Sequence, residues 1–441
     1  MPGGERGDTI AALATPPGRG GIGIVRISGP RVPDIARAVL GRLPAPRLAT
    51  HCDFLDAAGE RLDQGIALYY PAPRSYTGEA VLELQGHGGP VVMHAALGAA
   101  LDAGARLAEP GEFTRRAFLN GKLDLAQAEA VADLIDAASR EAARSALRSL
   151  TGEFSQAVDK LVAALIELRA LTEAMLDFPE EEIDRLHRDD AQARLARLRA
   201  GLEELLARGR QGSLLRAGIH VVLAGRPNVG KSSLLNRLAG EERAIVTAVP
   251  GTTRDALRES IQIDGVPIVV VDTAGLREST DEVERIGMAR TRSELARADV
   301  VLVVMEAGRM EAPAGPLPEA ASRITVVNKI DLVRGSAPGR HGEAIQVSAR
   351  TGAGLEALRA ALLEAVGWSS RGESVFLARE RHLRALETAR GHVVAAAAQQ
   401  AQWEFFAEEL RLAQEALSAI TGRVSADDLL GEIFARFCIG K

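Results

Sequence analysis

The sequence of 441 residues contains only two cysteines, Cys52 and Cys438. Two cysteines so far apart exclude a disulfide framework and a CxxC metal site, and they favour a reducing cytoplasm as the compartment. Uninterrupted apolar runs of the ~20 residues that a bilayer-spanning helix needs are also missing, and the N-terminus is polar and glycine-rich. We therefore expect neither secretion nor membrane insertion.

An excess of positive charge is missing as well. The chain has 53 Lys and Arg against 59 Asp and Glu, for a formal net charge of -6. A uniformly basic nucleic-acid-binding protein is therefore excluded, and any contact with RNA must be local. The length, with 46% hydrophobic and 25% charged residues, predicts two to four globular domains with a large buried core.

The first two segments differ in their content of glycine and proline. Residues 1–119 have short apolar runs, such as 22–27 and 80–84, broken by Gly and Pro clusters, which predicts a strand-rich α+β domain. Residues 120–215 contain few glycines or prolines and place apolar residues at helical spacing. This second segment is predicted to form long amphipathic helices, the first part of a helical domain.

The third segment, residues 216–372, alternates β-branched runs with helical patterns. This alternation is typical of a mostly parallel sheet covered by helices. Helical composition returns over 373–441, and we expect the two helical segments to pack together because each would otherwise expose an apolar stripe. The predicted fold class is thus α/β and α+β multidomain, with a Ras-like P-loop G domain inserted into a helical domain.

A phosphate-binding loop pattern opens the third segment, where Gly225–Ser232 reads GRPNVGKS after the apolar strand 219–223 and before a helix that starts at Ser233. Glycines let successive backbone N–H groups face phosphate oxygens, while Lys231 reaches the outer phosphates and the Ser232 hydroxyl binds Mg²⁺. The alternative, a glycine turn without a ligand, is poorly compatible with this strand-and-helix context.

Two further motifs follow in the order expected for a GTP-dependent switch. Residues 251–255 read GTTRD in a polar stretch where Thr253 can complete the Mg²⁺ shell. The apolar strand 268–271 then leads into Asp272, near the metal, and Gly275, whose amide would face the terminal phosphate. The expected phosphate and Mg²⁺ residues are Asn228, Val229, Gly230, Lys231, Ser232, Ser233, Gly251, Thr252, Thr253, Asp272, Thr273, Ala274 and Gly275.

The last motif selects the base. The run NKID, from Asn328 through Lys329 to Asp331, follows the apolar strand 324–327, and Ser348–Ala349 follows the strand 345–347. The Asp331 carboxylate can accept two hydrogen bonds from the N1 and N2 protons of guanine, whereas adenine offers no such pair of donors. The sequence therefore predicts GTP as the ligand.

The residue that positions the attacking water is less clear from the motifs. Ras-like GTPases place a glutamine after the DxxG glycine, but Leu276 occupies that position here. Glu284 lies in the acidic stretch 278–284 and either orients the water or simply begins a helix. No arginine finger stands out, and the Asn228 oxygen could hold a monovalent cation against the phosphates instead.

Motifs outside the third segment carry a resemblance to a known family. Residues 14–29 (ATPPGRGGIGIVRISG), 76–89, 109–125 and the C-terminal 438–441 (CIGK) are similar to the bacterial tRNA-modification GTPases called MnmE or TrmE, and the resemblance extends along essentially the whole chain. It implies a homodimer built by N-terminal domains that bind a tetrahydrofolate derivative, in the 5-formyl or 5,10-methylene form. It also implies work with the FAD protein MnmG on C5 of the wobble uridine of tRNA, to install a carboxymethylaminomethyl or aminomethyl group.

The resemblance assigns further residues by motif. Arg26, Glu83, Lys122 and Lys441 become folate contacts, although an ordinary internal ion pair remains an alternative for Arg26 and Glu83. Cys438 becomes a candidate catalytic thiol. Alternatively it is a small buried hydrophobe, whereas the final lysine does not fit a prenylation signal.

A potassium site is implied in the same way, and with it Glu284 as the water-positioning residue. Bound K⁺ would supply the charge that an arginine finger otherwise brings. The loop departs from the family pattern, since it reads TAVP where the family usually has TDIA, and Pro250 stiffens it. The potassium ligands implied are Asn228, Thr247, Val249 and Thr252, and the loop residues Thr247, Ala248, Val249 and Pro250 also join the GTP site.

Two alternatives of other classes are considered. A switch GTPase for ribosome assembly would carry a compact RNA-binding appendage in place of the long N-terminal segment and the CIGK terminus. A stand-alone folate-dependent one-carbon transferase regulated by GTP would turn over folate without a flavoprotein partner.

Overall fold

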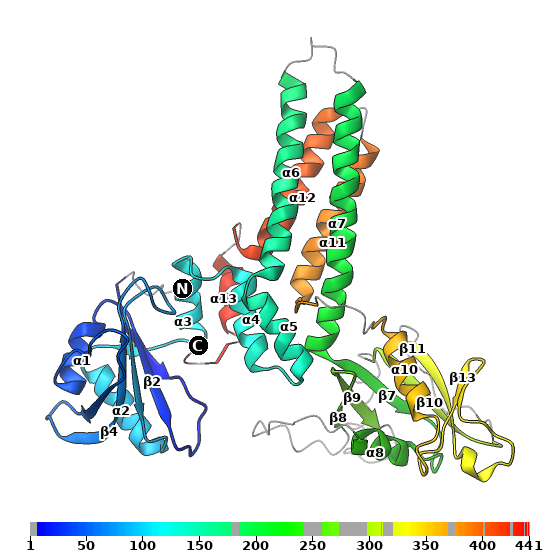
Figure 1. Ribbon diagram of the computed structural model, residues 1–441, viewed down its shortest axis with the longest axis horizontal. Coiled ribbons are helices and arrows are strands. Elements are labelled where there is room, and N and C mark those ends of the chain that lie inside the picture. Colours follow the sequence, from blue (N-terminus) through cyan, green and yellow to red (C-terminus); the bar gives the residue numbers. More distant parts are fainter. Residues whose placement is uncertain are drawn as a thin grey trace, which may run out of the picture. The chain divides into compact units, whose positions relative to one another are not determined.

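The computed structural model describes residues 7–177, 185–241, 258–272, 298–309, 311, 321–368, 375–399, 402–423, 427–435, 437–438 and 440. The chain divides into two compact units (Figure 1). The first unit comprises residues 1–132 and 418–441, and the second comprises residues 133–417. These units are coarser than the four segments predicted from the sequence.

The first unit contains a six-stranded sheet with the order β3-β4-β5-β2-β1-β6. All neighbouring pairs are antiparallel except β1 with β6. Helices α1 (Val32–Leu40) and α2 (Pro90–Asp102) share a hydrophobic core with one face of this sheet. The strands are β1 (Ile10–Leu13), β2 (Gly23–Ser28), β3 (Thr50–Leu55), β4 (Arg61–Tyr70), β5 (Val81–Gly86) and β6 (Arg106–Leu107).

Strand β2 shows why the two sheet faces differ. Its side chains alternate, so Val25 and Ile27 enter the helix-covered core while Arg26 lies on the opposite face. On that opposite face Phe113, from α3 (Glu112–Leu119), packs with Ile10 of β1. The sheet therefore has a second, partly polar face that can carry a site.

The C-terminal segment completes the first unit. Helix α13 (Asp427–Ala435) buries apolar side chains against the start of α4 (Leu125–Ile135). The shared cluster consists of Leu125, Ala128, Leu430, Ile433, Phe434 and Phe437. Residues at the two ends of the sequence are thus brought into one compact body.

The helices of the second unit lie before and after the predicted nucleotide segment in sequence. They are α5 (Arg140–Leu150), α6 (Glu153–Asp177), α7 (Arg185–Ala217), α11 (Glu380–Ala398) and α12 (Trp403–Thr421). Helix α7 packs against α6 and α11 (Figure 1), so the two helical segments pair as expected. None of the helices in the described ranges is long and apolar enough to cross a bilayer.

The rest of the second unit is a seven-stranded sheet with the order β12-β13-β11-β10-β7-β9-β8. Only the edge strands β8 and β12 run antiparallel to their neighbours. The strands are β7 (Ile219–Ala224), β8 (Arg258–Ile263), β9 (Val266–Asp272), β10 (Val300–Glu306), β11 (Ser322–Asn328), β12 (Gly339–His341) and β13 (Ala344–Gln346), with helices α8 (Lys231–Glu241) and α10 (Leu355–Ala365). Parallel central strands with helices confirm the predicted α/β class.

Candidate functional site

The loop between β7 and α8 has the backbone curl that a phosphate-binding loop requires. Asn228 has φ 65° and Gly230 has φ 94°, both in the left-handed region that asparagine and glycine tolerate best. A Cβ on Gly225 would collide with the Val304 carbonyl oxygen. Lys231 is buried, and its Nζ donates to the carbonyl oxygens of Gly225 (2.9 Å) and Arg226 (3.1 Å). The ammonium group therefore lies inside the curl, where phosphate oxygens of a nucleotide would meet it.

Asn328 ties this loop to the predicted base-binding residues. Its buried side chain donates from Nδ2 to the Val229 carbonyl oxygen (3.0 Å) and accepts at Oδ1 from the Ala349 amide (3.0 Å). A Cβ on Gly230 would collide with the same Nδ2 atom. Three segments that the sequence analysis assigned to one nucleotide are thus joined through a single amide side chain.

Two neighbouring side chains contact the Asp331 carboxylate and orient it. Ser348 Oγ donates to Asp331 Oδ1 at 2.6 Å, and Arg350 Nη2 lies 2.9 Å from Asp331 Oδ2. The hydrogen bond from Ser348 holds the pKa of Asp331 below its ordinary value, with a smaller contribution from Arg350. The ionised carboxylate at neutral pH is the form that can accept both guanine protons. Arg350 was missed in the sequence, although it directly follows Ala349.

The remaining predicted nucleotide residues are only partly covered by the described ranges. Asp272 ends β9 and pairs in register with Leu223 of β7, so its backbone stands at the same strand-end edge as the phosphate loop. Ser232 and Ser233 are in the first turn of α8. The residues outside the described ranges are Thr247, Ala248, Val249, Pro250, Gly251, Thr252, Thr253, Thr273, Ala274, Gly275, Glu284 and Lys441.

A second cluster, in the first unit, is centred on Arg26. The register of β2 and β5 places Arg26 opposite Glu83, and Arg26 Nε donates to Glu83 Oε1 at 2.9 Å. The guanidinium carbon lies 5.7 Å from the centroid of the Tyr76 ring and 5.9 Å from that of Phe113, within the range of a cation–π contact. Burial raises the pKa of Tyr76, whose hydroxyl lies 2.8 Å from Thr114 Oγ1.

The C-terminal tail reaches this cluster. Arg26 Nη1 donates to the Gly440 carbonyl oxygen at 3.4 Å, and the Gly111 amide donates to the Cys438 carbonyl oxygen at 3.3 Å. Gly440 has φ 97°, and a Cβ there would collide with the Leu13 carbonyl oxygen, so only glycine permits this approach. The Cys438 side chain is exposed, so the alternative that it is a buried hydrophobe is wrong.

Lys122 lies at the end of the turn that follows α3. Its Nζ donates to the Pro73 carbonyl oxygen at 3.5 Å, and the neighbouring Asn120 Nδ2 donates to the Thr77 carbonyl oxygen at 2.7 Å. The structure therefore places Lys122 over the loop that carries Tyr76, whereas Arg26 and Glu83 are paired directly.

Comparison with known proteins decides the family. The family model described as "MnmE helical domain" matches residues 125–438, and the one described as "GTP-binding protein TrmE N-terminus" matches residues 9–122. The protein named tRNA modification GTPase MnmE from Azoarcus sp. (strain BH72) is 62% identical over 98% of both chains. The chain belongs to the MnmE family. Membership confirms the predictions of a GTPase and of the resemblance stated above.

A second relative with the same name, from Thiobacillus denitrificans, is 60% identical over 99% of this chain and 98% of its own. Among solved structures, the G domain of FeoB from Methanococcus jannaschii covers 33% of this chain and 96% of its own at 25% identity. Its TM-score of 0.25 is too low to add to the MnmE assignment. The ribosome-assembly alternative has no observation in its favour.

An ion network that sequence reasoning missed holds α3 of this MnmE-family chain. Arg116 pairs with Asp8 (2.6 Å), Glu79 (3.1 Å) and Glu112 (2.9 Å), and Arg106 pairs with Asp8 (2.5 Å) and Glu112 (2.6 Å). These contacts fasten α3 to the loop that contains Tyr76. The cluster around Arg26 is thus supported from outside by a second set of charges.

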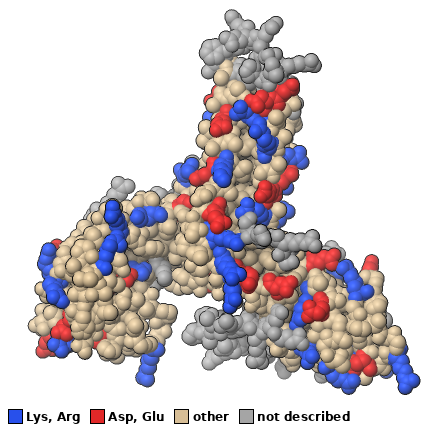
Figure 2. Space-filling view, in the orientation of Figure 1, with Lys and Arg blue, Asp and Glu red and all other residues tan. Residues whose placement is uncertain are grey.

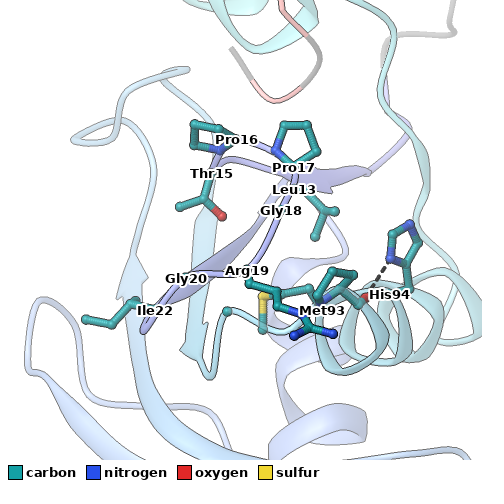
Figure 3. Close-up of a pocket in the computed structure, with 12 residues that line it drawn as sticks. Leu13, Thr15, Pro16, Pro17, Gly18, Arg19, Gly20, Ile22, Met93 and His94 are labelled. Carbon is teal, nitrogen blue, oxygen red and sulfur yellow. Dashed lines mark hydrogen bonds between the residues drawn. The ribbon is translucent and has the colours of Figure 1, made fainter. Parts of the chain in front are cut away.

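A cavity of about 330 Å³ lies between the β1–β2 loop and the start of α2 (Figure 3). Leu13, Arg19, Met93 and His94 contribute to its lining, and His94 Nδ1 lies 2.7 Å from the Pro90 carbonyl oxygen. Leu13 packs with the helix-covered core, on the face of the sheet opposite to Arg26. Among the described residues that line this cavity, none was predicted to bind a ligand of an MnmE protein.

Proposed function

We propose that the protein hydrolyses GTP under activation by K⁺ and acts with the FAD protein MnmG to install a carboxymethylaminomethyl or aminomethyl group at C5 of the wobble uridine, U34, of certain tRNAs. One observation carries this proposal: a single chain combines the Ser348–Asp331 hydrogen bond, at the predicted base-binding motif, with the Arg26–Glu83 pair, and it matches a named tRNA modification GTPase over 98% of its length.

In the second unit, each residue of the nucleotide site has a distinct task. Lys231 binds the outer phosphates, Ser232 and Thr253 provide hydroxyls for Mg²⁺, and Asp331 holds the guanine base. Charge that develops on the phosphates during hydrolysis is stabilised by groups already oriented for it, namely the loop amides and the Lys231 ammonium. This assignment is supported by the curl of the loop and by the position of Lys231 within it.

Glu284 would hold the attacking water, because Leu276 has no polar group to do so. Asn228, with an exposed side chain beside the phosphate loop, would bind K⁺ together with Thr247, Val249 and Thr252. The cation would supply positive charge at the phosphates in place of an arginine finger.

In the first unit, the residues present fit a tetrahydrofolate derivative in its 5-formyl or 5,10-methylene form. A pterin ring carries adjacent N–H donors and an acceptor, which Glu83 and Arg26 can match, and the Tyr76 and Phe113 rings offer apolar surface. The side chains of Arg26 and Glu83 are 18% and 14% exposed, so neither is fully enclosed by the protein. Lys122 and Lys441 would contact the same ligand, which would supply the one-carbon unit, and Cys438 would act as a catalytic thiol.

The proposed assembly is a homodimer in the cytoplasm, where MnmG and tRNA are both available. Hydrolysis in the second unit and folate binding in the first unit are then two parts of one reaction on tRNA. This proposal gives the N-terminal sheet domain and the nucleotide-binding domain distinct tasks within one protein.

The test is GTP hydrolysis by the purified full chain in matched KCl and NaCl buffers, with ATP as a nucleotide control. We expect hydrolysis in KCl to be at least about tenfold faster, and Glu284→Ala to slow it by roughly a hundredfold while GTP still binds. Equal rates in both salts would remove the potassium mechanism. Formation of modified U34 by the chain, MnmG, GTP, folate and an amine or ammonium source for the nitrogen of the group, but not by the same mixture without MnmG, would support the complete proposal and exclude a stand-alone transferase.

A further inference from the structure

Helix α5 of the second unit exposes a row of arginines. Arg140, Arg144 and Arg148 follow one another at intervals of four residues, so they lie along one side of the helix about 6 Å apart. Arg140 and Arg144 are exposed, and Leu147, between Arg144 and Arg148, is 50% exposed. Figure 2 shows basic side chains gathered over the position of α5. We call Arg140, Arg144 and Arg148 the arginine row.

The opposite side of α5 is fully used by the fold. Ala142 and Ala146 belong to the hydrophobic core of the seven-stranded sheet, and Ser149 Oγ donates to the Leu377 carbonyl oxygen at 3.2 Å. Packing therefore fixes which side of α5 faces outward. The arginine row stands on a rigid element.

The charges of the row are not balanced within the part of the chain that the structure describes. Arg140 and Arg144 have no carboxylate partner there, and Arg148 donates only to the Val375 carbonyl oxygen, at 3.5 Å. Glu141, the one acidic residue on α5, accepts instead from Gln262 Nε2 at 3.3 Å. The row keeps most of its guanidinium donors for an external partner.

On other helices of the same unit, several arginines form ion pairs within their own helix. A carboxylate three or four residues away pairs with each of Arg169, Arg194, Arg199, Arg208, Arg384 and Arg411. Such pairs support a helix, whereas like charges four residues apart oppose it. The arginine row, which has no carboxylate partner in the described residues, therefore differs from these ion-paired arginines.

The position of Arg140 at the start of α5 is a second unfavourable feature. Ser139 caps α5 by accepting from the Ala142 amide at 3.0 Å, which makes Arg140 the first residue of the helix. The helix dipole places partial positive charge at this end, so an arginine there is disfavoured. Two unfavourable features in eleven residues are explained if the row binds a polyanion.

We infer that the arginine row is a docking surface for the phosphate backbone of tRNA, an inference that rests on the proposed function. Guanidinium groups bind phosphates through paired N–H donors, and the exposed Leu147 offers apolar contact to a ribose. The chain as a whole carries a net charge of -6, so a polyanion must be recognised by a local surface of this kind. The row contacts backbone rather than bases, and it positions the tRNA without reading its sequence.

The experiment compares the double variant Arg140→Gln/Arg144→Gln with wild type in the full-length protein. Binding of an in vitro transcribed tRNA with uridine at position 34 is followed by fluorescence anisotropy over a series of KCl concentrations. We expect the affinity to fall roughly tenfold and the slope of log K against log[salt] to decrease by about 1 for each arginine that contacts a phosphate. GTP affinity and the thermal midpoint should stay unchanged.

The matched control is Arg197→Gln/Arg199→Gln on α7, which removes the same charge from the same unit. Arg197 Nε donates to the Ala193 carbonyl oxygen and Arg199 pairs with Glu203, so we expect tRNA affinity within about twofold of wild type. Arg140→Lys/Arg144→Lys keeps the charge and should keep most of the binding. If the lysine variant binds tRNA and the glutamine variant does not, the loss of binding is due to the lost charge and not to misfolding.

The outcomes are distinguishable. If wild type binds the tRNA and the α5 double variant binds it with the same affinity and salt slope, the arginine row is not the RNA surface. If only the affinity for MnmG falls, the row docks an acidic protein surface and the RNA assignment is overturned. If wild type binds no tRNA, alone or with MnmG, the proposed function itself fails.

Discussion

Asp331, the residue predicted to bind guanine, is held in place by two neighbouring side chains. Ser348 and Arg350 hold its two oxygens, and the hydrogen bond from Ser348 keeps the pKa low enough for ionisation at neutral pH. A carboxylate in fixed geometry can select guanine, because a base without both donors leaves an acceptor unmatched. The nearby Ala349 amide donates to Asn328, so the loop predicted to contact the base is also restrained.

Replacing Asp331 tests this selection. In Asp331→Asn the charged acceptor becomes an amide, and we expect GTP affinity to fall by roughly ten- to a hundredfold. Wild type should also prefer GTP to ITP, which lacks the 2-amino group, while the variant loses this preference. Fluorescence titration with labelled GDP, competed by GTP and ITP, measures both effects. Unchanged discrimination in the variant would show that another group reads the base.

The residues of the predicted base-binding site could be identified from the sequence, but their hydrogen-bond and ion-pair partners could not. Asn328, Asp331 and Ser348 were identifiable because each follows an apolar strand, and strand ends meet at one edge of a parallel sheet. The double role of Asn328 was not predictable, because its partners depend on how three loops pack. The ion network of Arg116 was missed for the same reason, since its partner Asp8 is 108 residues away in sequence.

Helix α3 depends on that network at the scale of one element. Burial raises the pKa of Glu112, but hydrogen bonds from Arg106, from the Glu109 amide and from Arg116 outweigh it and bring the pKa below its ordinary value. The ionised form therefore stabilises the fold. This contribution is complete above the ordinary pKa and is lost as the pH falls through the lowered one.

Glu112→Gln removes this contribution. At pH 7 we expect the variant to lose roughly 1–3 kcal/mol of local stability, because Arg106 and Arg116 keep fewer acceptors. The difference from wild type should shrink as the pH falls below the ordinary glutamate pKa and through the lowered pKa of Glu112. Hydrogen exchange of α3 peptides, compared between proteins at each pH, gives the measurement. The exposed Glu109→Gln serves as the control and should match wild type, and a difference that is independent of pH would contradict the ionic mechanism.

The β8–β9 hairpin is an element whose turn is determined by both backbone and packing. Asp264 and Gly265 have φ 48° and 81°, as a two-residue hairpin turn requires, and the Asp-Gly pair is a strong sequence signal for it. The structure adds what the sequence could not show. A Cβ on Gly265 would lie 2.6 Å from Cδ of Glu141, because the turn rests on α5.

Gly265→Ala should therefore lower the unfolding free energy by more than the strain of its backbone conformation alone would. We expect a loss of roughly 2–3 kcal/mol in unfolding free energy, against about 1 kcal/mol for Gly335→Ala, which has a similar φ of 85° but open space around it. Denaturant unfolding followed by tryptophan fluorescence in a Trp403→Phe background reports on this core, because Trp368, which packs against it, is then the one remaining tryptophan. Adding Glu141→Ala should restore the part due to contact. Equal losses at Gly265 and Gly335 would mean that the hairpin is not seated on α5.

At the scale of the second unit, one carboxylate holds both connections to the nucleotide-binding sheet. Asp133 Oδ1 accepts from Arg216, at the end of α7, at 2.9 Å, and from Arg379, just before α11, at 2.8 Å. The hydrophobic core of the sheet also includes Leu215 and Leu377. The helices and the sheet thus share both a hydrophobic core and ion pairs, so they form one packed body.

At the scale of the whole molecule, the proposed function divides the work between the two units, and this division can be tested by reciprocal variants. Lys231→Ala should abolish GTP hydrolysis and, with it, modification of U34 by the full system of MnmG, tRNA, folate, an amine or ammonium source, GTP and K⁺. Arg26→Ala should keep hydrolysis within about twofold while modification is lost, because Glu83 is left without its partner in the proposed folate site. Arg31→Ala is the control, since its guanidinium donates to the carbonyl oxygens of Ala103 and Gly104 on the first unit. Full modification by Arg26→Ala would reduce Arg26 and Glu83 to an ordinary ion pair, and loss of modification by Arg31→Ala would attribute the effect to the stability of the sheet.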